Sequence, residues 1–212
     1  MENLSSIVGT IVYIILGLVA LWGAYCVVAV WMRVAQKRFA TEEQQNLFLE
    51  ALEEPLSRGD FETAEEICAG DRRAVCQLAY IAIANRKEGY TKVKQLVLDR
   101  FERDVLGDLE HRLTWVNTVI KSAPMIGLFG TVIGMMGAFY TLASATTVEP
   151  AKLAADIQIA LITTACGLAI AIPLVLATAS INIRIRKMED LIGSGLTRFF
   201  EAMRNSLGKH KN

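Results

Sequence analysis

The stretch Ser122-Ala-Pro-Met-Ile-Gly-Leu-Phe-Gly-Thr-Val-Ile-Gly-Met-Met-Gly137 decides the fold. It lies in a window, residues 122–148, that contains no Asp, Glu, Lys or Arg, and two more such windows cover residues 7–32 and 157–183. Each window exceeds the roughly 20 apolar residues that a helix needs to cross a hydrocarbon core of ~30 Å. We therefore predict an all-α, polytopic membrane protein with transmembrane helices over residues 7–32, 122–145 and 157–183.

The composition supports a membrane protein. Hydrophobic residues make up 53% of the 212 residues, and the mean hydropathy is +0.36. Helices buried in soluble proteins are the alternative, but they seldom run beyond about 14 uncharged residues. The leader Met1-Glu2-Asn3 is acidic, so the first window is expected to stay as an anchor rather than to be cleaved as a signal peptide. Lys+Arg and Asp+Glu balance at 22 each, so the net charge gives no support to a nucleic-acid partner.

Basic residues near the span ends predict the orientation, because they favour the cytoplasmic side. They gather after the first span, before the second and after the third: Arg33, Lys37, Arg38, Arg112, Lys121, Arg184, Arg186 and Lys187. The opposite side has only Lys152, beside Glu149 and Asp156. The predicted order is a periplasmic N-terminus (1–6), a cytoplasmic helical domain (33–121), a periplasmic loop (146–156) and a cytoplasmic C-terminal helix and tail (184–212).

The segment between the first two spans is predicted to be helical throughout. Thr41-Glu42-Glu43-Gln44 is a capping-box signal for a helix start. Arg58-Gly59-Asp60 indicates a turn in which Asp60 caps the next helix, Gly70-Asp71 marks another boundary, and Gly89 ends the helix that follows.

From Thr91 we expect one long helix that runs directly into the second span. It carries one apolar stripe, formed by Val93, Leu96, Val97, Phe101, Val105, Leu109 and Leu113. The stripe is interpreted first as packing within the cytoplasmic domain. Packing against the same helix of a neighbouring subunit remains an alternative.

Two spans carry stripes of small residues at helical spacing. The second span has Gly127, Gly130, Gly134 and Gly137 on one face, which Thr131 shares; the third span has Ala160, Thr164, Gly167 and Ala171. Small residues let helix backbones approach closely in a membrane, so ordinary span packing explains them in part. Pro173 removes a backbone donor and is expected to bend the third span.

The two threonines are predicted to lie at the same depth. At ~1.5 Å per residue, Thr131 lies about 13.5 Å from the inner boundary at Ser122 and Thr164 about 12 Å from the outer boundary at Asp156, so both fall near the middle of the bilayer. Each hydroxyl could simply bond a carbonyl of its own helix. The alternative is that they form a polar lining.

The three charge-free windows contain no carboxylate that could bind and release a proton. A proton relay through lipid normally needs such an ionisable residue. If the chain conducts ions, the titrating group must come from a partner. Cys26, Cys68, Cys76 and Cys166 match no zinc motif and imply no disulfide framework, and the two histidines are far apart. We expect no metal, no cofactor and no enzymatic activity.

The span motifs resemble those of the ExbB/TolQ/MotA family. The run Ala123-Pro-Met-Ile-Gly-Leu-Phe-Gly-Thr-Val-Ile-Gly-Met-Met136 is similar to its second-span signature, and Ala160-Leu-Ile-Thr-Thr-Ala-Cys-Gly-Leu-Ala-Ile-Ala-Ile-Pro173 to its third. Gly59-Asp60-Phe61, with Ala64 and Cys68 after it, resembles the helical domain of the family. Three spans place the chain closer to ExbB and TolQ than to MotA.

The resemblance implies an ion-conducting, stator-ring subunit of an inner-membrane motor. Five copies would surround two helices of an ExbD/TolR-like single-span protein, whose intramembrane Asp takes up the ion, and a TonB-like effector is a further candidate partner. Thr131, Thr163 and Thr164 would line the ion path. The residues implied in helix packing and partner contact are Pro124, Gly127, Gly130, Gly134, Gly137, Ala160, Gly167, Ala171 and Pro173.

One position departs from the pattern. ExbB and TolQ usually have a glutamate five residues before the position of Thr164, where this chain has Ile159, preceded by Gln158. MotA-type stators do without it. The departure leaves the choice between proton and sodium open, and it keeps a second hypothesis alive, a membrane scaffold that assembles partners but passes no ions.

Overall fold

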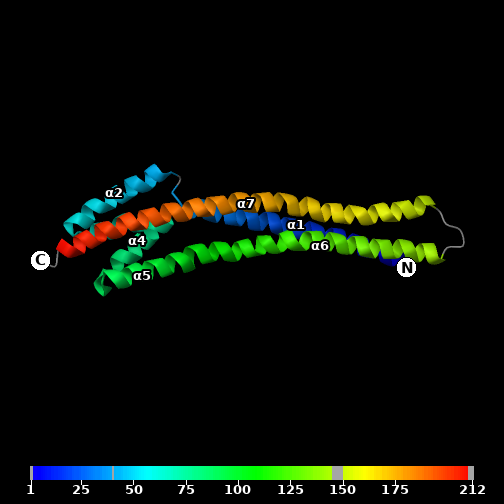
Figure 1. Ribbon diagram of the computed structural model, residues 1–212, viewed down its shortest axis with the longest axis horizontal. Helices are drawn as coiled ribbons and strands as arrows, with labels where there is room; N and C mark the ends of the chain where they lie inside the picture. The colour runs from blue at the N-terminus through cyan, green and yellow to red at the C-terminus, as the bar shows by residue number, and fades with distance from the viewer. Residues whose placement is uncertain (1, 40, 145–149, 210–212) are drawn as a thin grey trace. The chain divides into compact units, whose positions relative to one another are not determined.

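A computed structural model describes residues 2–39, 41–144 and 150–209, and this part of the chain is helical with short connections and contains no strand (Figure 1). The helices are α1 (Glu2–Lys37), α2 (Glu42–Arg58), α3 (Phe61–Cys68), α4 (Ala74–Ala84), the 3-10 turn η1 (Arg86–Glu88), α5 (Tyr90–Arg100), the π-helix η2 (Phe101–Leu106), α6 (Gly107–Ser144) and α7 (Pro150–Lys209). Three stretches are long and apolar enough to cross a membrane: Gly9–Lys37, Tyr90–Ala143 and Leu153–Ser206. The predicted all-α, three-span architecture is confirmed.

The chain divides into two compact units, which are described separately. The span unit comprises residues 1–29 and 112–180, and the helical-domain unit comprises residues 30–111 and 181–212. In the span unit, α6 and α7 lie side by side with α1 against them (Figure 1). Gly23 of α1 faces Val119 of α6 and Leu174 of α7 so closely that a Cβ there would lie 2.8 Å from both side chains.

Local signals start α2 and α3 as predicted, whereas α4 ends at Ala84 and Gly89 instead ends the 3-10 turn η1 that follows it. The Thr41 hydroxyl accepts a hydrogen bond from the Gln44 amide and caps α2. Gly59 ends that helix at φ 77°, a conformation that costs glycine little. Asp60 then caps α3 by accepting from the Thr63 amide.

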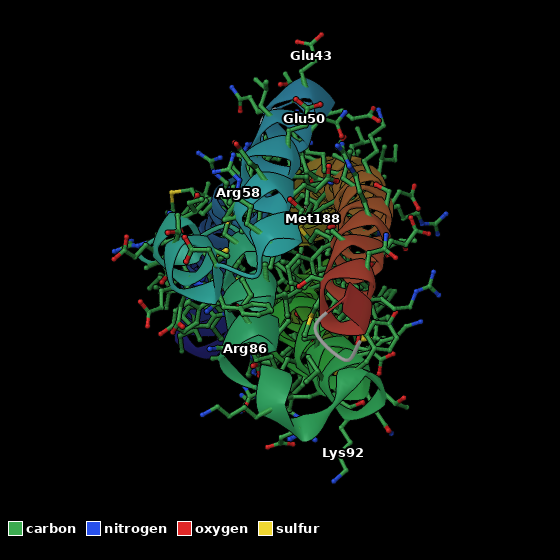
Figure 2. All side chains as sticks on the ribbon, turned by 90° about the vertical axis from the view of Figure 1, so that its left-hand side faces the viewer. Glu43, Glu50, Arg58, Arg86, Lys92 and Met188 are labelled. Carbon is green, nitrogen blue, oxygen red and sulfur yellow. The ribbon has the colours of Figure 1, made fainter. Side chains whose placement is uncertain are left out.

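Large apolar side chains fill the core of the helical-domain unit. Leu56 of α2, Ile83 of α4 and Met188 of α7 are fully buried, whereas Glu43 and Lys92 point outward into solvent (Figure 2). Arg198 of α7 binds Glu53 of α2 at 2.5 Å. Burial of apolar surface thus holds this unit, and a partly exposed ion pair adds to it.

The long helix expected from Thr91 is helical throughout, but its geometry changes. Residues Phe101–Leu106 form a π-helix that ends immediately before Gly107, a glycine that the sequence-based prediction overlooked. Most of the predicted stripe turns inward, with Val97 and Val105 buried. Packing inside the domain therefore accounts for the four buried residues of the stripe, Val93, Val97, Val105 and Leu109.

The helix ends differ from the predicted boundaries. Helix α7 begins at Pro150, so residues 150–156 of the predicted loop are helical, and the rest of that loop, up to residue 149, lies outside the described residues. Residues 2–6 continue α1. The side of the membrane on which each end lies stays a prediction.

Candidate functional site

Helices α6 and α7 meet backbone to backbone at the glycine stripe. A Cβ at Gly127 would lie 2.6 Å from the carbonyl oxygen of Thr163, and one at Gly167 would lie 2.6 Å from that of Ala123. Real Cβ atoms do not approach this closely, so only glycine fits without moving a helix. The stripes therefore pack the two helices of one chain against each other.

Further residues implied in helix packing lie at the same contact. A Cβ at Gly134 would lie 2.7 Å from the Cβ of Ala160, and one at Gly130 would lie 2.7 Å from the Thr163 hydroxyl. A Cβ at Gly167 would also lie 3.2 Å from the Cα of Pro124. The side chain of Ala171 is buried. Contact of any stripe residue with a partner helix stays a prediction.

Two of the residues implied in helix packing are more open. Gly137 is half-buried, and its carbonyl accepts from the Thr141 hydroxyl at 3.0 Å. Pro173 lies exposed inside α7, which remains one helix from Pro150 to Lys209. The bend expected at Pro173 stays a prediction.

Helix packing brings the three predicted threonines together. The hydroxyls of Thr131, on α6, and Thr164, on α7, are hydrogen-bonded to each other. Thr131 Oγ1 also lies 3.0 Å from the carbonyl oxygen of Ala160, and Thr164 Oγ1 lies 3.2 Å from that of Gly127. Residue counting predicts that Thr131 and Thr164 lie at the same depth, and the hydrogen bond between their hydroxyls agrees with this prediction.

Thr163 plays a different part from its two neighbours. It is only 2% exposed, and its hydroxyl lies 2.7 Å from the carbonyl oxygen of Ala160 and 3.0 Å from that of Gly127. Its single proton therefore satisfies buried carbonyls between the helices. Thr131 and Thr164 are half-buried and remain the more accessible pair.

Counting protons shows what this hydroxyl pair can do. Each hydroxyl has one proton and two lone pairs. Between Thr131 and Thr164 one hydroxyl donates and the other accepts, and the acceptor can give its own proton to a carbonyl. Both oxygens keep lone pairs. The pair can accept a hydrogen bond from a protonated acid or ligate a small cation, but it cannot act as an acid at neutral pH.

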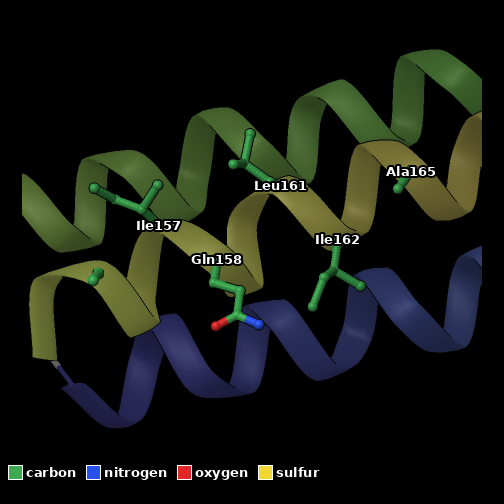
Figure 3. A pocket seen from close by; sticks show the side chains of 6 residues that line it. Ile157, Gln158, Leu161, Ile162 and Ala165 are labelled. Carbon is green, nitrogen blue, oxygen red and sulfur yellow. The ribbon is translucent and has the colours of Figure 1, made fainter. Parts of the chain in front are cut away.

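A second feature lies along the exposed face of α7. Gln158 projects from α7 toward the ribbon of α1, beside a shallow, mostly apolar hollow lined by Ile157, Leu161, Ile162 and Ala165 (Figure 3).

The side chain of Ile159, at the position that departs from the family pattern, is 53% exposed. The hydroxyl of Tyr13 on α1 donates to the Ile159 carbonyl at 3.3 Å. Sequence reasoning missed this tyrosine, although a polar ring inside an apolar span was a signal for it.

The cysteines are free thiols. Burial raises the pKa of the Cys68 thiol to about 12 and that of Cys76 above its usual range, so neither ionises near neutral pH. Among the described residues no three His, Cys, Asp or Glu side chains gather as metal ligands.

Comparison with known proteins decides the class. The sequence model described as the MotA/TolQ/ExbB proton channel family matches residues 79–193, more than half of the chain. The chain belongs to this family. The matched segment contains both stripes of small residues and all three threonines, so the family match covers the candidate site.

Individual relatives of this family member agree. The Tol-Pal system protein TolQ of Haemophilus influenzae is 39% identical over 102 residues, which are 48% of this chain and 45% of TolQ. The biopolymer transport protein ExbB of Aquifex aeolicus is 30% identical over 115 residues, 53% of this chain and 76% of that ExbB. A putative ExbB-like protein of Helicobacter pylori is 40% identical over 84 residues, 40% of this chain and 54% of its own length. The chain thus spans about half the length of several curated relatives.

Proposed function

We propose that this chain is an ion-conducting stator-ring subunit of a bacterial inner-membrane motor, which couples a proton or sodium motive force to work on the cell envelope. The observation that carries the proposal is the hydroxyl pair of Thr131 and Thr164, joined across α6 and α7. It places polar oxygens with free lone pairs in a region that has no Asp, Glu, Lys or Arg. Membership of a proton channel family supports the same function.

The missing acid points to a partner. An ExbD/TolR-like protein with one span and an intramembrane Asp would supply the carboxyl group that the windows 122–148 and 157–183 lack. Two such helices inside a ring of five copies of this chain would bring the Asp against the hydroxyl pair. One charge that crosses the membrane gains about 2.3 kcal/mol per 100 mV, several times thermal energy, which is enough to bias the rotation of the partner helices.

The proposal includes a topology and a downstream partner. Basic residues at the span ends favour a cytoplasmic helical domain and C-terminus and a periplasmic N-terminus. A TonB-like effector would receive the motion on the periplasmic side.

Ion flux tests the role of the hydroxyl pair. The chain and its partner are reconstituted in liposomes with a proton- or sodium-sensitive dye inside. Thr164→Val keeps the side-chain shape but removes the oxygen, so flux is expected to fall to that of liposomes without protein while the complex still assembles.

Thr178→Val is the matched control. Thr178 is buried on the same helix, and its hydroxyl donates to the Leu174 carbonyl of its own turn at 2.8 Å. We expect this variant to conduct as the wild type does. Full flux through an assembled Thr164→Val complex would contradict the proposed role of the pair.

A non-conducting scaffold is the second candidate function. The observation in its favour is Ile159, an exposed apolar side chain where ExbB and TolQ usually have a glutamate. The wild-type complex separates the two functions: a scaffold assembles with its partner and yet gives no flux under either a proton or a sodium gradient.

A further inference from the structure

A basic groove lies in the helical-domain unit, apart from the hydroxyl pair. Its lining comes from α1 and the residue directly after it, from α2, from the segment before α4 and from α7: Trp31, Val34, Ala35, Arg38, Gln44, Arg73 and Arg184. We propose that this groove binds the phosphate headgroup of an anionic phospholipid. The proposal concerns a lipid site and does not depend on ion conduction.

Aromatic rings hold two of the three guanidinium groups in place. The Cζ of Arg184 lies 4.0 Å from the ring centroid of Trp31, and that of Arg73 lies 4.3 Å from the ring centroid of Phe39. Stacking orders a guanidinium plane by cation–π attraction and leaves its N–H edge free. Such an edge can donate two parallel hydrogen bonds to the oxygens of one phosphate.

The charge of the groove is poorly compensated. No lining residue is acidic. Asp71 pairs with Arg73 at 3.6 Å, but within the part of the chain that the structure describes, Arg38 and Arg184 have no carboxylate within 4.0 Å. Three cations beside one neighbouring anion leave an excess of positive charge, and this favours an anionic ligand.

The position in the sequence favours a lipid over a soluble phosphate. Trp31 lies one residue before the end of the first charge-free window, and Arg184 directly follows the third. Trp rings and Arg side chains are typical of the headgroup level of a bilayer. Val34 and Ala35 line the groove beside the arginines. A ligand with a phosphate and an apolar part matches both kinds of lining.

Quenching of Trp31 fluorescence tests the site. Trp22→Phe and Trp115→Phe leave Trp31 as the sole tryptophan of the chain. The chain is reconstituted in vesicles that contain a small fraction of bromine-labelled phosphatidylglycerol, or the same fraction of bromine-labelled phosphatidylcholine. Phosphatidylglycerol is expected to quench Trp31 several-fold more strongly, because the arginines concentrate it next to the ring.

Arginine variants locate the effect. Arg38→Gln or Arg184→Gln is expected to weaken the preference for phosphatidylglycerol about five-fold. Arg186→Gln is the matched control, because Arg186 is an exposed arginine two residues further along α7 that does not line the groove. Circular dichroism checks that each variant is folded. Arg184→Lys, which keeps the charge, replaces any variant that does not fold.

Three results would overturn the proposal. Equal quenching by the two lipids would show that there is no headgroup preference. An Arg186→Gln effect as large as that of Arg184→Gln would show attraction to the surface as a whole. Loss of the preference in millimolar inorganic phosphate at constant ionic strength would assign the groove to a soluble anion.

Discussion

Helix α7 makes two contacts of opposite character. In the span unit it meets α6 through glycine backbone and threonine hydroxyls, with a Cβ at Gly127 excluded by the Thr163 carbonyl. In the helical-domain unit the same helix meets other helices through large buried side chains such as Met188 and Phe199. The first contact depends on close approach and hydrogen bonds, and the second on burial of apolar area.

The difference follows from the solvent of each unit. Lipid tails are as apolar as leucine, so burying leucine between two spans gains little, and close backbone packing takes over. In water each buried apolar side chain contributes about 1.5–3 kcal/mol. Accordingly, α6 leaves Met125 and Leu128 70% and 58% exposed, whereas leucines of α2 fill the core. The predictions below test this contrast.

The largest effect is expected from a cavity in the helical-domain unit. Leu56 is fully buried, so Leu56→Ala should lower the free energy of unfolding by about 3 kcal/mol. Leu47→Ala on the same helix is the control, because Leu47 is 65% exposed and its loss should cost about 0.5 kcal/mol or less. Urea unfolding in detergent measures both, and similar costs would contradict the contrast.

An added methyl group should be nearly as harmful in the span unit. Gly127→Ala places a Cβ against the Thr163 backbone and should destabilise the α6–α7 pair by about 2 kcal/mol. Gly17→Ala in α1 meets no atom within 4 Å and should be neutral or slightly stabilising, since alanine favours helix. Unfolding by SDS in mixed micelles compares them, and equal stability of the two variants would refute the close-packing account.

A buried hydroxyl should contribute less. Thr163→Val removes the donor to the Gly127 and Ala160 carbonyls and is expected to cost about 1 kcal/mol. Thr163→Ser keeps the donor and should recover most of the stability in the same SDS assay. If serine is no better than valine, the hydroxyl does not hold the helices together.

The smallest effect concerns a cap in the helical-domain unit. The Thr63 hydroxyl and amide donate to the Asp60 carboxylate and hold its pKa below the usual range. Since the pKa of Asp60 is lower in the folded state, its contribution is complete above the unfolded pKa and is lost as pH falls through the folded pKa. In the variant Asp60→Asn, the asparagine side chain can still cap α3 but has no carboxyl group that titrates.

The thermal midpoint of both proteins, measured from neutral to acidic pH, checks this prediction. The gap between wild type and Asp60→Asn should be widest at neutral pH and should close in acid. A gap that stays constant across the range would show that the carboxylate charge contributes nothing to the cap.

The sequence predicted the spans and caps well because their signals are local. A charge-free window indicates a span by its own length and composition. Thr41 and Asp60 each cap the helix that directly follows, and Gly59 ends the helix that directly precedes it. The depth count placed Thr131 and Thr164 together because helices have a fixed rise.

What the sequence could not give depends on three-dimensional contact. The stripes of small residues were predicted to pack helices, but periodicity alone could not show that α6 packs on α7 within the chain. Contact of the stripes with partner helices stays a prediction. The hydrogen bond from Tyr13 to Ile159 and the stacking of Arg184 on Trp31 join residues more than 140 positions apart. The π-helix before Gly107 is a change of hydrogen-bond register that no propensity scale records.

The hydroxyl pair of Thr131 and Thr164 allows two hydrogen-bond arrangements, because either hydroxyl can be the donor. Thr131 can donate to Thr164 while Thr164 donates to the Gly127 carbonyl, or the direction can reverse, with Thr131 donating to the carbonyl of Ala160. Turning two O–H bonds interconverts the arrangements without moving a heavy atom or separating charge. In the proposed ion path, an ion-bearing group that arrives from either side of the pair would meet an oxygen able to accept its hydrogen bond, so the pair itself would favour neither direction. Directionality would then come from the proposed partner helices or from the gradient across the membrane.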